Sequence, residues 1–412
     1  MTAFQTLAIL LTFAALGAYI NNKFLKLPAT IGVMAVALVV SLGAIGFNWL
    51  GLVDLSAAET FVSHINFSDI LLHGMLSFLL FAGALHVDLN ELWKFRGIVS
   101  LLATIGVVIA TFVTGTLVWY AAGWLGFPFP YIEALLFGAL IAPTDPVAVL
   151  GILKQAGISK SLRIKIAGES LLNDGVGVAV FLVLLGIAAN QQAPHPGEVA
   201  FVLGWEIFGS AALGLALGWI TYRLLRGIED YKVEVMLTLA LVAGGYSFAE
   251  VVHVSAPITM VVAGLLIGNH GRVFGMSDKT REHLDVFWEL LDEILNALLF
   301  MLMGLEMMII SIRAPQLALG LVAIIAMLAG RFISVAIPVY FMRMQHRFEA
   351  GTIRILTWGG LRGGISIAMA LSLPAGPDKD LLLAMTYIAV VFSILFQGTT
   401  FRHFVRMLAK HP

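Results

Sequence analysis

The sequence predicts an all-α polytopic membrane protein with about thirteen transmembrane helices. Of its 412 residues, 60% are hydrophobic and only 12% are charged, and the mean hydropathy is +0.96. A soluble chain carries roughly 25% charged residues, whereas these apolar residues suffice for a series of spans of about 20 residues each. The composition therefore excludes a soluble enzyme, a disordered chain and a nucleic-acid-binding protein. A net charge of −1 gives no reason to expect a polyanionic partner, and the absence of cysteine excludes disulfides and thiolate metal sites.

The apolar runs, divided at their polar residues, predict the spans in order. They are 4–20, 28–46, 69–87, 97–120, 131–153, 164–188, 199–222, 233–251, 255–269, 286–311, 316–342, 354–374 and 381–401. Lysine and arginine concentrate in cytoplasmic loops and so test this division. With the N-terminus outside, the cytoplasmic segments hold 20 of the 24 basic residues, and the outer segments hold only Arg313 and Lys379. This alternation predicts an N-out, C-in topology.

Five ionisable residues remain inside the predicted spans, and they mark the region of interest. They are Asp145, Glu169, Asp174, Arg331 and Arg362. Counted at 1.5 Å per residue from the cytoplasmic bases, Asp145, Asp174, Arg331 and Arg362 lie roughly 12–18 Å into a ~30 Å core. A charge there costs at least about 2.5–3.5 kcal/mol, so it indicates either a buried ion pair that fixes helix packing or a functional site. Three acids against two bases favour a titrating ion site.

Two of the predicted spans contain a break in the helical backbone at this depth. In predicted helix 5, Pro143 and Pro146 flank Thr144 and Asp145, and in predicted helix 12, Gly360 and Gly363 flank Leu361 and Arg362. Proline removes a helical hydrogen bond, and unwound backbone is tolerated in a membrane only inside protein or along a cavity. A kinked structural helix would explain either break alone. A matching break in each half of the chain instead indicates a transporter site.

The orientation of the spans adds a symmetry to these breaks. Predicted helices 1–6 and 8–13, joined by helix 7, have opposite orientations in the membrane, which is the arrangement of an inverted repeat. The two broken helices, 5 and 12, thus form a matching pair, one in each half of the chain.

Predicted helix 6 supplies oxygen ligands on one face. Ser170 and Asp174 are four residues apart and share a face, and Glu169 and Asn173 form a neighbouring pair. We expect a hard monovalent cation to bind at Asp174, Asp145, the Ser170 hydroxyl and a freed Thr144 carbonyl. Two nearby carboxylates also raise each other's proton affinity. Such a site can hold a cation or a proton but not both comfortably, and this competition is itself an exchange mechanism.

These motifs resemble the NhaP/NHE branch of the monovalent cation:proton antiporters. The resemblance rests on Thr144-Asp145-Pro146, on the run from Gly168 to Asp174, on Gly360-Leu361-Arg362-Gly363 and on the thirteen-span layout. It implies a sodium/proton antiporter, not an enzyme, that needs no cofactor. Asp174 would be the main carboxylate for cation and proton, and Asn173 beside it would imply electroneutral one-for-one exchange.

The resemblance also implies roles for the two intramembrane arginines. Glu169 would be salt-bridged to a core arginine, and we favour Arg331 over Arg362 as its partner. Arg362 would then hold the two crossed, broken helices, 5 and 12, together and compensate their partial charges.

The resemblance implies a domain organisation and partners as well. A core domain, 91–190 and 313–412, would move against a dimerisation domain, 1–90 and 231–312, with 191–230 as the linker helix. The expected partners are the lipid bilayer, protons and a second copy of the chain. The expected cation is Na+, with Li+ or K+ as alternatives, and no nucleic acid is expected to bind. The expected location is a prokaryotic plasma (inner) membrane.

Three other functions are alternatives to sodium/proton exchange. K+/H+ exchange by the same fold stays open, because ion selectivity depends on cavity geometry. Two intramembrane aspartates suit an intramembrane aspartyl protease, but Asp145 follows Thr and Asp174 follows Asn, not the Tyr-Asp and Gly-x-Gly-Asp patterns of those enzymes. A cation channel would not need buried carboxylates flanked by arginines and paired breaks.

The remaining acids in predicted helix 10 have less specific interpretations. Glu289, Asp292 and Glu293 mark either an interfacial helix end or an acidic funnel that concentrates cations. Glu306 lies deeper and is interpreted as a hydrogen-bonded packing residue.

Overall fold

The computed structural model describes residues 3–63, 65–145, 149, 159–190, 197, 201, 204–272, 276–310, 314–343, 348–349, 351–376 and 378–410. All regular secondary structure in these ranges is helical, which confirms the all-α prediction. Eight of the described helices are long and apolar enough to cross a membrane, and a bent pair, Ala58–Leu72 with Leu76–Leu85, would make a ninth. The count of thirteen spans and their orientation stay predictions. Pro146, part of the first predicted break, lies outside the described residues.

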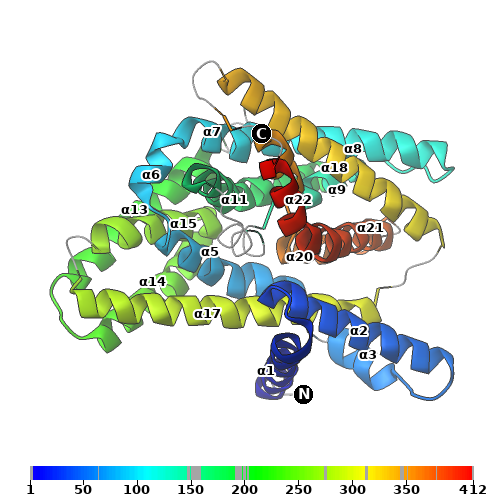
Figure 1. Ribbon diagram of the computed structural model, residues 1–412, viewed down its shortest axis with the longest axis horizontal. Helices are drawn as coiled ribbons and strands as arrows, with labels where there is room; N and C mark the ends of the chain where they lie inside the picture. The colour runs from blue at the N-terminus through cyan, green and yellow to red at the C-terminus, as the bar shows by residue number, and fades with distance from the viewer. Residues whose placement is uncertain are drawn as a thin grey trace. The chain divides into compact units, whose positions relative to one another are not determined.

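The chain divides into two compact units. Unit 1 comprises Met1–Leu71, Val108–Ser159 and Asn296–Pro412. Its helices are α1 (Ala3–Ile20), η1 (Asn21–Leu25), α2 (Ala29–Trp49), α3 (Ser56–Ser63), α4 (Phe67–Asp69), α8 (Val107–Trp124), α9 (Tyr131–Ile141), η6 (Glu306–Met308), α18 (Ala314–Met342), α19 (Thr352–Trp358), α20 (Gly364–Leu371), α21 (Lys379–Val391), η7 (Phe392–Gln397) and α22 (Gly398–Lys410). The last turns of α17 (Asp278–Leu305) also belong to it. In Figure 1, α18 lies along α21, and α21 and α20 in turn pack against α9.

Unit 2 comprises Leu72–Val107 and Lys160–Leu295. Its helices are most of η2 (Ile70–Met75), α5 (Leu76–Leu85), α6 (Leu89–Lys94), α7 (Arg96–Leu101), η3 (Leu102–Gly106), α11 (Lys160–Asn190), η4 (Trp205–Gly209), α13 (Ser210–Leu225), α14 (Tyr231–Val251), α15 (Ala256–Leu266), η5 (Ile267–Gly271) and the larger part of α17. The short helix α15 packs against α5, α13 and α14, and Trp288 of α17 contributes to the same buried core. Gly264 allows the close contact of α15 with α5, because a Cβ there would lie 2.9 Å from the Phe81 carbonyl oxygen.

Polar residues at the helix ends determine where several helices begin. The Asp88 side chain accepts hydrogen bonds from two backbone N–H groups at the start of α6. Asp230 and Ser255 each accept one hydrogen bond from a backbone N–H group at the start of α14 and α15, respectively. Such caps satisfy N–H groups that have no partner within the helix. The polar residues that divided the apolar runs thus act as helix caps.

The compact units group the helices differently from the predicted domains. Unit 1, for example, holds both 1–71, expected in the dimerisation domain, and 313–412, expected in the core domain. Compactness in one conformation does not report which parts move together, so the division into core and dimerisation domains stays a prediction.

Candidate ion-binding site

The two predicted breaks meet in unit 1. Helix α9 ends at Ile141 and is followed by the non-helical residues 142–145, and α19 ends at Trp358 and is followed by the non-helical residues 359–363. The Asp145 backbone N–H donates a hydrogen bond to the Leu361 carbonyl oxygen at 2.8 Å. Two non-helical segments far apart in the chain therefore satisfy each other's backbone groups, as unwound backbone at membrane depth requires.

Arg362 binds the end of the first broken helix. Its side chain is 1% exposed, and its Nη1 donates to the carbonyl oxygens of Ala142 at 2.9 Å and Pro143 at 3.0 Å. These carbonyls follow the last turn of α9, where helical partners are missing and the partial charge is negative. The guanidinium both completes their hydrogen bonds and compensates this charge. The predicted role of Arg362, to hold the two broken helices together, stays a prediction.

Arg331 binds the end of the second broken helix. Its Nε donates to the Leu356 carbonyl oxygen in the last turn of α19 at 3.2 Å. A Cβ on Gly360 would lie 2.5 Å from the same Nε. Glycine at position 360 is therefore needed for this arginine to approach the backbone of the break.

Asp145 lies where the second half of the broken helix begins. A Cβ on Gly363 would lie 2.5 Å from Asp145 Oδ2, so the carboxylate packs directly on this glycine. Gly363 is the residue before the first turn of α20. The N-terminal end of a helix carries a positive partial charge, which favours a carboxylate at this place. Thr144, next to Asp145, is 1% exposed.

Three polar side chains at these helix ends were not predicted as part of the site. Ser393 of η7 accepts the Arg362 backbone N–H at 3.0 Å, and Gln397, one turn later, donates to the Trp358 carbonyl oxygen at 3.2 Å. Lys379 donates to two carbonyl oxygens at the end of α20, Leu371 at 2.8 Å and Leu373 at 2.6 Å. The available signal for the first two was a pair of polar residues, four apart, in an otherwise apolar run.

Unit 2 carries the other predicted ligands on one continuous helix. The four side chains of Glu169, Ser170, Asn173 and Asp174 are between 1% and 5% exposed, and all lie on α11, which runs unbroken from Lys160 to Asn190. Ser170 and Asp174 are one turn apart and share a face. The structure thus groups Thr144, Asp145, Arg331 and Arg362 in unit 1 and these four in unit 2, and the predicted ion ligands and the Glu169–arginine pair stay predictions.

Two glycines allow neighbouring helices to approach α11 beside these residues. A Cβ on Gly168 would collide with Leu92, and a Cβ on Gly175 would collide with Ile258. The helix accordingly packs against α6, α7 and α15. Close packing explains why a helix with several glycines remains unbroken and buries its polar residues.

Lys165 is a further buried basic residue on α11. Its side chain is 3% exposed, and its Nζ lies 4.7 Å from the centroid of the Phe95 ring. A cation over an aromatic face is stabilised by the ring quadrupole. Closer to the start of α11, Lys160 and Lys94 donate to Glu91 at 3.3 and 3.2 Å, and these hydrogen bonds lower the pKa of the Glu91 carboxyl.

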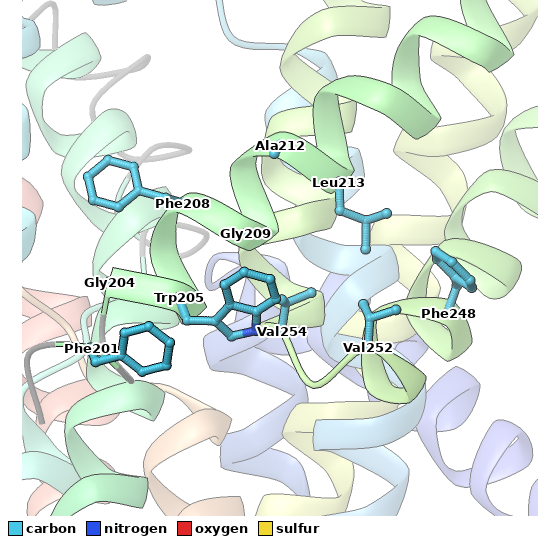
Figure 2. A pocket seen from close by; sticks show the side chains of 10 residues that line it. All are labelled: Phe201, Gly204, Trp205, Phe208, Gly209, Ala212, Leu213, Phe248, Val252 and Val254. Carbon is cyan, nitrogen blue, oxygen red and sulfur yellow. The ribbon is translucent and has the colours of Figure 1, made fainter. Parts of the chain in front are cut away.

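A hollow lined by described residues of unit 2 does not suit a cation. It has a volume of about 780 Å³ and is lined by aromatic and aliphatic side chains, with the Trp205 indole beside Val254 (Figure 2). Its lining contains no carboxylate. Among the described residues, no three His, Cys, Asp or Glu side chains are grouped to hold a metal ion either. The ligands expected from the sequence, Thr144, Asp145, Ser170 and Asp174, stay a prediction.

Comparison with known proteins assigns this arrangement to a family. A family model described as "Sodium/hydrogen exchanger, transmembrane" matches residues 10–407. The chain is 49% identical over 413 residues to the Na(+)/H(+) antiporter NhaP of Pseudomonas aeruginosa, covering 99% of this chain and 96% of that protein. It is 32% identical over 394 residues to the Na(+)/H(+) antiporter NhaH of Halobacillus aidingensis, covering 94% and 93%.

A solved structure has the same fold. The sodium proton antiporter MjNhaP1 from Methanocaldococcus jannaschii at pH 8 superposes with a TM-score of 0.74 over 99% of this chain and 98% of that chain, at 20% identity.

Proposed function

The chain belongs to the sodium/hydrogen exchanger family and is an integral membrane protein, and from this premise we propose that it exchanges Na+ for H+ across a prokaryotic plasma membrane. The family consists of transporters, in agreement with the prediction that the chain is not an enzyme. The relatives named as Na(+)/H(+) antiporters support the choice of ions, since one of them is 49% identical over nearly the whole chain.

We propose that Asp174 is the carboxylate for which Na+ and H+ compete. The observation that carries this proposal is the burial of Asp174 on an unbroken helix, 5% exposed, one turn from the Ser170 hydroxyl and next to Asn173. A cation that reaches a buried carboxylate must displace its proton, because the low-dielectric surroundings disfavour an uncompensated charge. Thr144 and Asp145 of unit 1 remain the further ligands that we propose from the sequence.

We further propose one-for-one, electroneutral exchange by alternating access. Asn173 supports this stoichiometry, because an uncharged residue beside Asp174 leaves one titrating carboxylate on that face of α11. The paired breaks support alternating access, because discontinuous helices at the bilayer midplane are typical of transporters that rock around a fixed site. The transporter works as a homodimer in this proposal.

Reconstituted vesicles with an imposed pH gradient test the function. Adding Na+ should dissipate the gradient, and clamping the membrane potential to zero should leave the rate unchanged. Asp174→Asn should abolish exchange, whereas Asp54→Asn, a change in an exposed position, should not. Exchange that survives Asp174→Asn would refute the assignment of the carboxylate. Dissipation by K+ and not by Na+ would support the K+/H+ alternative, and conductance without proton coupling would refute exchange altogether.

A further inference from the structure

Glu306 is a buried acid that the proposed exchange does not use. It is the first residue after α17, its side chain is 1% exposed, and its Oε2 has no hydrogen-bond partner. Among the residues that the structure describes, no lysine, arginine or histidine forms an ion pair with it. The expected hydrogen-bonded packing therefore does not account for this side chain.

Two helices that pack against the short helix of Glu306 supply no positive charge. Its short helix, η6, packs against α2 and α3. Helix α2 contains no titratable residue, and the only one in α3 is Glu59, an exposed acid. From α21, Tyr387 reaches the preceding turn of α17, but its hydroxyl donates to the Met303 carbonyl oxygen at 2.9 Å. The charged residues of α21 are Lys379 and Asp380 in its first turn, and the Lys379 ammonium donates to the Leu371 and Leu373 carbonyl oxygens.

The backbone around Glu306 also disfavours a negative charge. Glu306 follows the C-terminal end of a 28-residue helix, where the partial charge of the helix is negative. Two carbonyls of this last turn are buried and need donors from elsewhere: Tyr387 binds that of Met303, and the Ser41 hydroxyl binds that of Gly304 at 2.8 Å. A carboxylate here would add a charge to an end that is already electronegative. An uncharged carboxylic acid would not.

We propose that Glu306 is a resident proton-binding site, whose carboxyl group holds its own proton and stays uncharged in the folded protein. The ligand is a proton that is separate from the one exchanged, so the proposal does not rest on the proposed function. An isolated charge without a partner is too costly in such surroundings, and the group binds a proton instead. Loss of this proton in alkaline solution places an uncompensated charge between α2, α17 and α21 and weakens their packing.

Infrared spectroscopy of the purified full-length protein in detergent tests the proton directly. At neutral pH the wild type should show the C=O stretching band of a protonated carboxyl group that is lost in Glu306→Gln. The matched control, Glu59→Gln, should leave this band unchanged, because Glu59 is exposed. A neutral-pH spectrum that is the same in wild type and Glu306→Gln would overturn the proposal.

Thermal unfolding provides an independent measurement. Glu306→Gln should unfold at the wild-type midpoint at neutral pH and should be less sensitive than the wild type to alkaline pH. If Glu306 is instead a carboxylate held by a positive charge, the substitution will lower the midpoint at neutral pH, and the proposal is wrong. If Glu306→Gln fails to fold, a second uncharged variant, Glu306→Met, is measured in its place. Failure of both to fold would also contradict the proposal, because an uncharged replacement should be tolerated.

Discussion

Replacing Arg362 by methionine tests whether one guanidinium holds the broken helix α9 in place. The substitution keeps an unbranched apolar stem but removes the two hydrogen bonds to the Ala142 and Pro143 carbonyls. A hydrogen bond to a charged group contributes about 1.5–3 kcal/mol, so the two together contribute about 3–6 kcal/mol. The carbonyls that remain are buried and carry the negative partial charge of a helix end, so no water replaces the lost donors.

Hydrogen–deuterium exchange measures this loss at the break itself. The Asp145 amide is bonded to the Leu361 carbonyl oxygen and exchanges only when the two breaks separate. Because about 1.4 kcal/mol corresponds to a tenfold change in an equilibrium constant, exchange of the peptide that contains Asp145 should accelerate by about 10² to 10⁴-fold in Arg362→Met. The thermal midpoint should fall as well.

Two further variants make the result specific. Arg343→Met removes an exposed arginine from the end of α18 and should change neither quantity. Arg362→Lys should have an intermediate effect, since an ammonium retains the charge but not the planar fork of donors. If exchange at Asp145 in Arg362→Met equals that of the wild type, the guanidinium does not hold the two breaks together and the energetic reasoning is refuted.

Three further changes have defined outcomes. Gly363→Ala should reduce Na+-dependent dissipation of a pH gradient by more than about tenfold, because the new Cβ would displace the Asp145 carboxylate. A displacement of about 1 Å can lower a rate by about 10²-fold. Gly43→Ala, where a Cβ meets no atom within 4 Å, should leave transport unchanged. Asn269→Leu should lower the stability of unit 2 by about 2–4 kcal/mol, since the amide makes three hydrogen bonds to backbone groups, and an unaltered thermal midpoint would contradict this estimate. Glu91 has a folded-state pKa below its ordinary value of 4.5, so its contribution to stability is present above pH 4.5 and is lost as the pH falls through the lowered pKa. Glu91→Gln should therefore be less sensitive than the wild type to acidification below pH 4.5 in thermal unfolding scans, and equal sensitivity would show that this carboxylate does not stabilise the fold.

The backbone at the two breaks was predictable from the sequence because its cause is local. Pro143 removes a helical donor wherever it lies, and a run of glycines weakens any helix. The burial of the acids on α11 was also predictable, since an ionisable residue in the middle of an apolar span has to face protein or a cavity. Composition and charge distribution, which need no tertiary contacts, were sufficient for the all-α membrane fold.

The partners of the buried groups were decided only by the tertiary structure. Arg362 binds the carbonyls that follow α9, and Gln397 binds the end of α19, so both contacts join segments that are distant in the chain. Hydropathy does not specify such contacts, because it does not determine how each helix is turned about its axis. The same limit applied to Glu306, which the sequence pattern assigned to hydrogen-bonded packing. In the folded chain its Oε2 has no hydrogen-bond partner among the described residues, and the helices α2 and α3 that pack against η6 carry no base. Local chemistry determines which residues must leave lipid and where a helix must break. Which donor meets which acceptor depends on the packing of whole helices, and only the folded chain determines that.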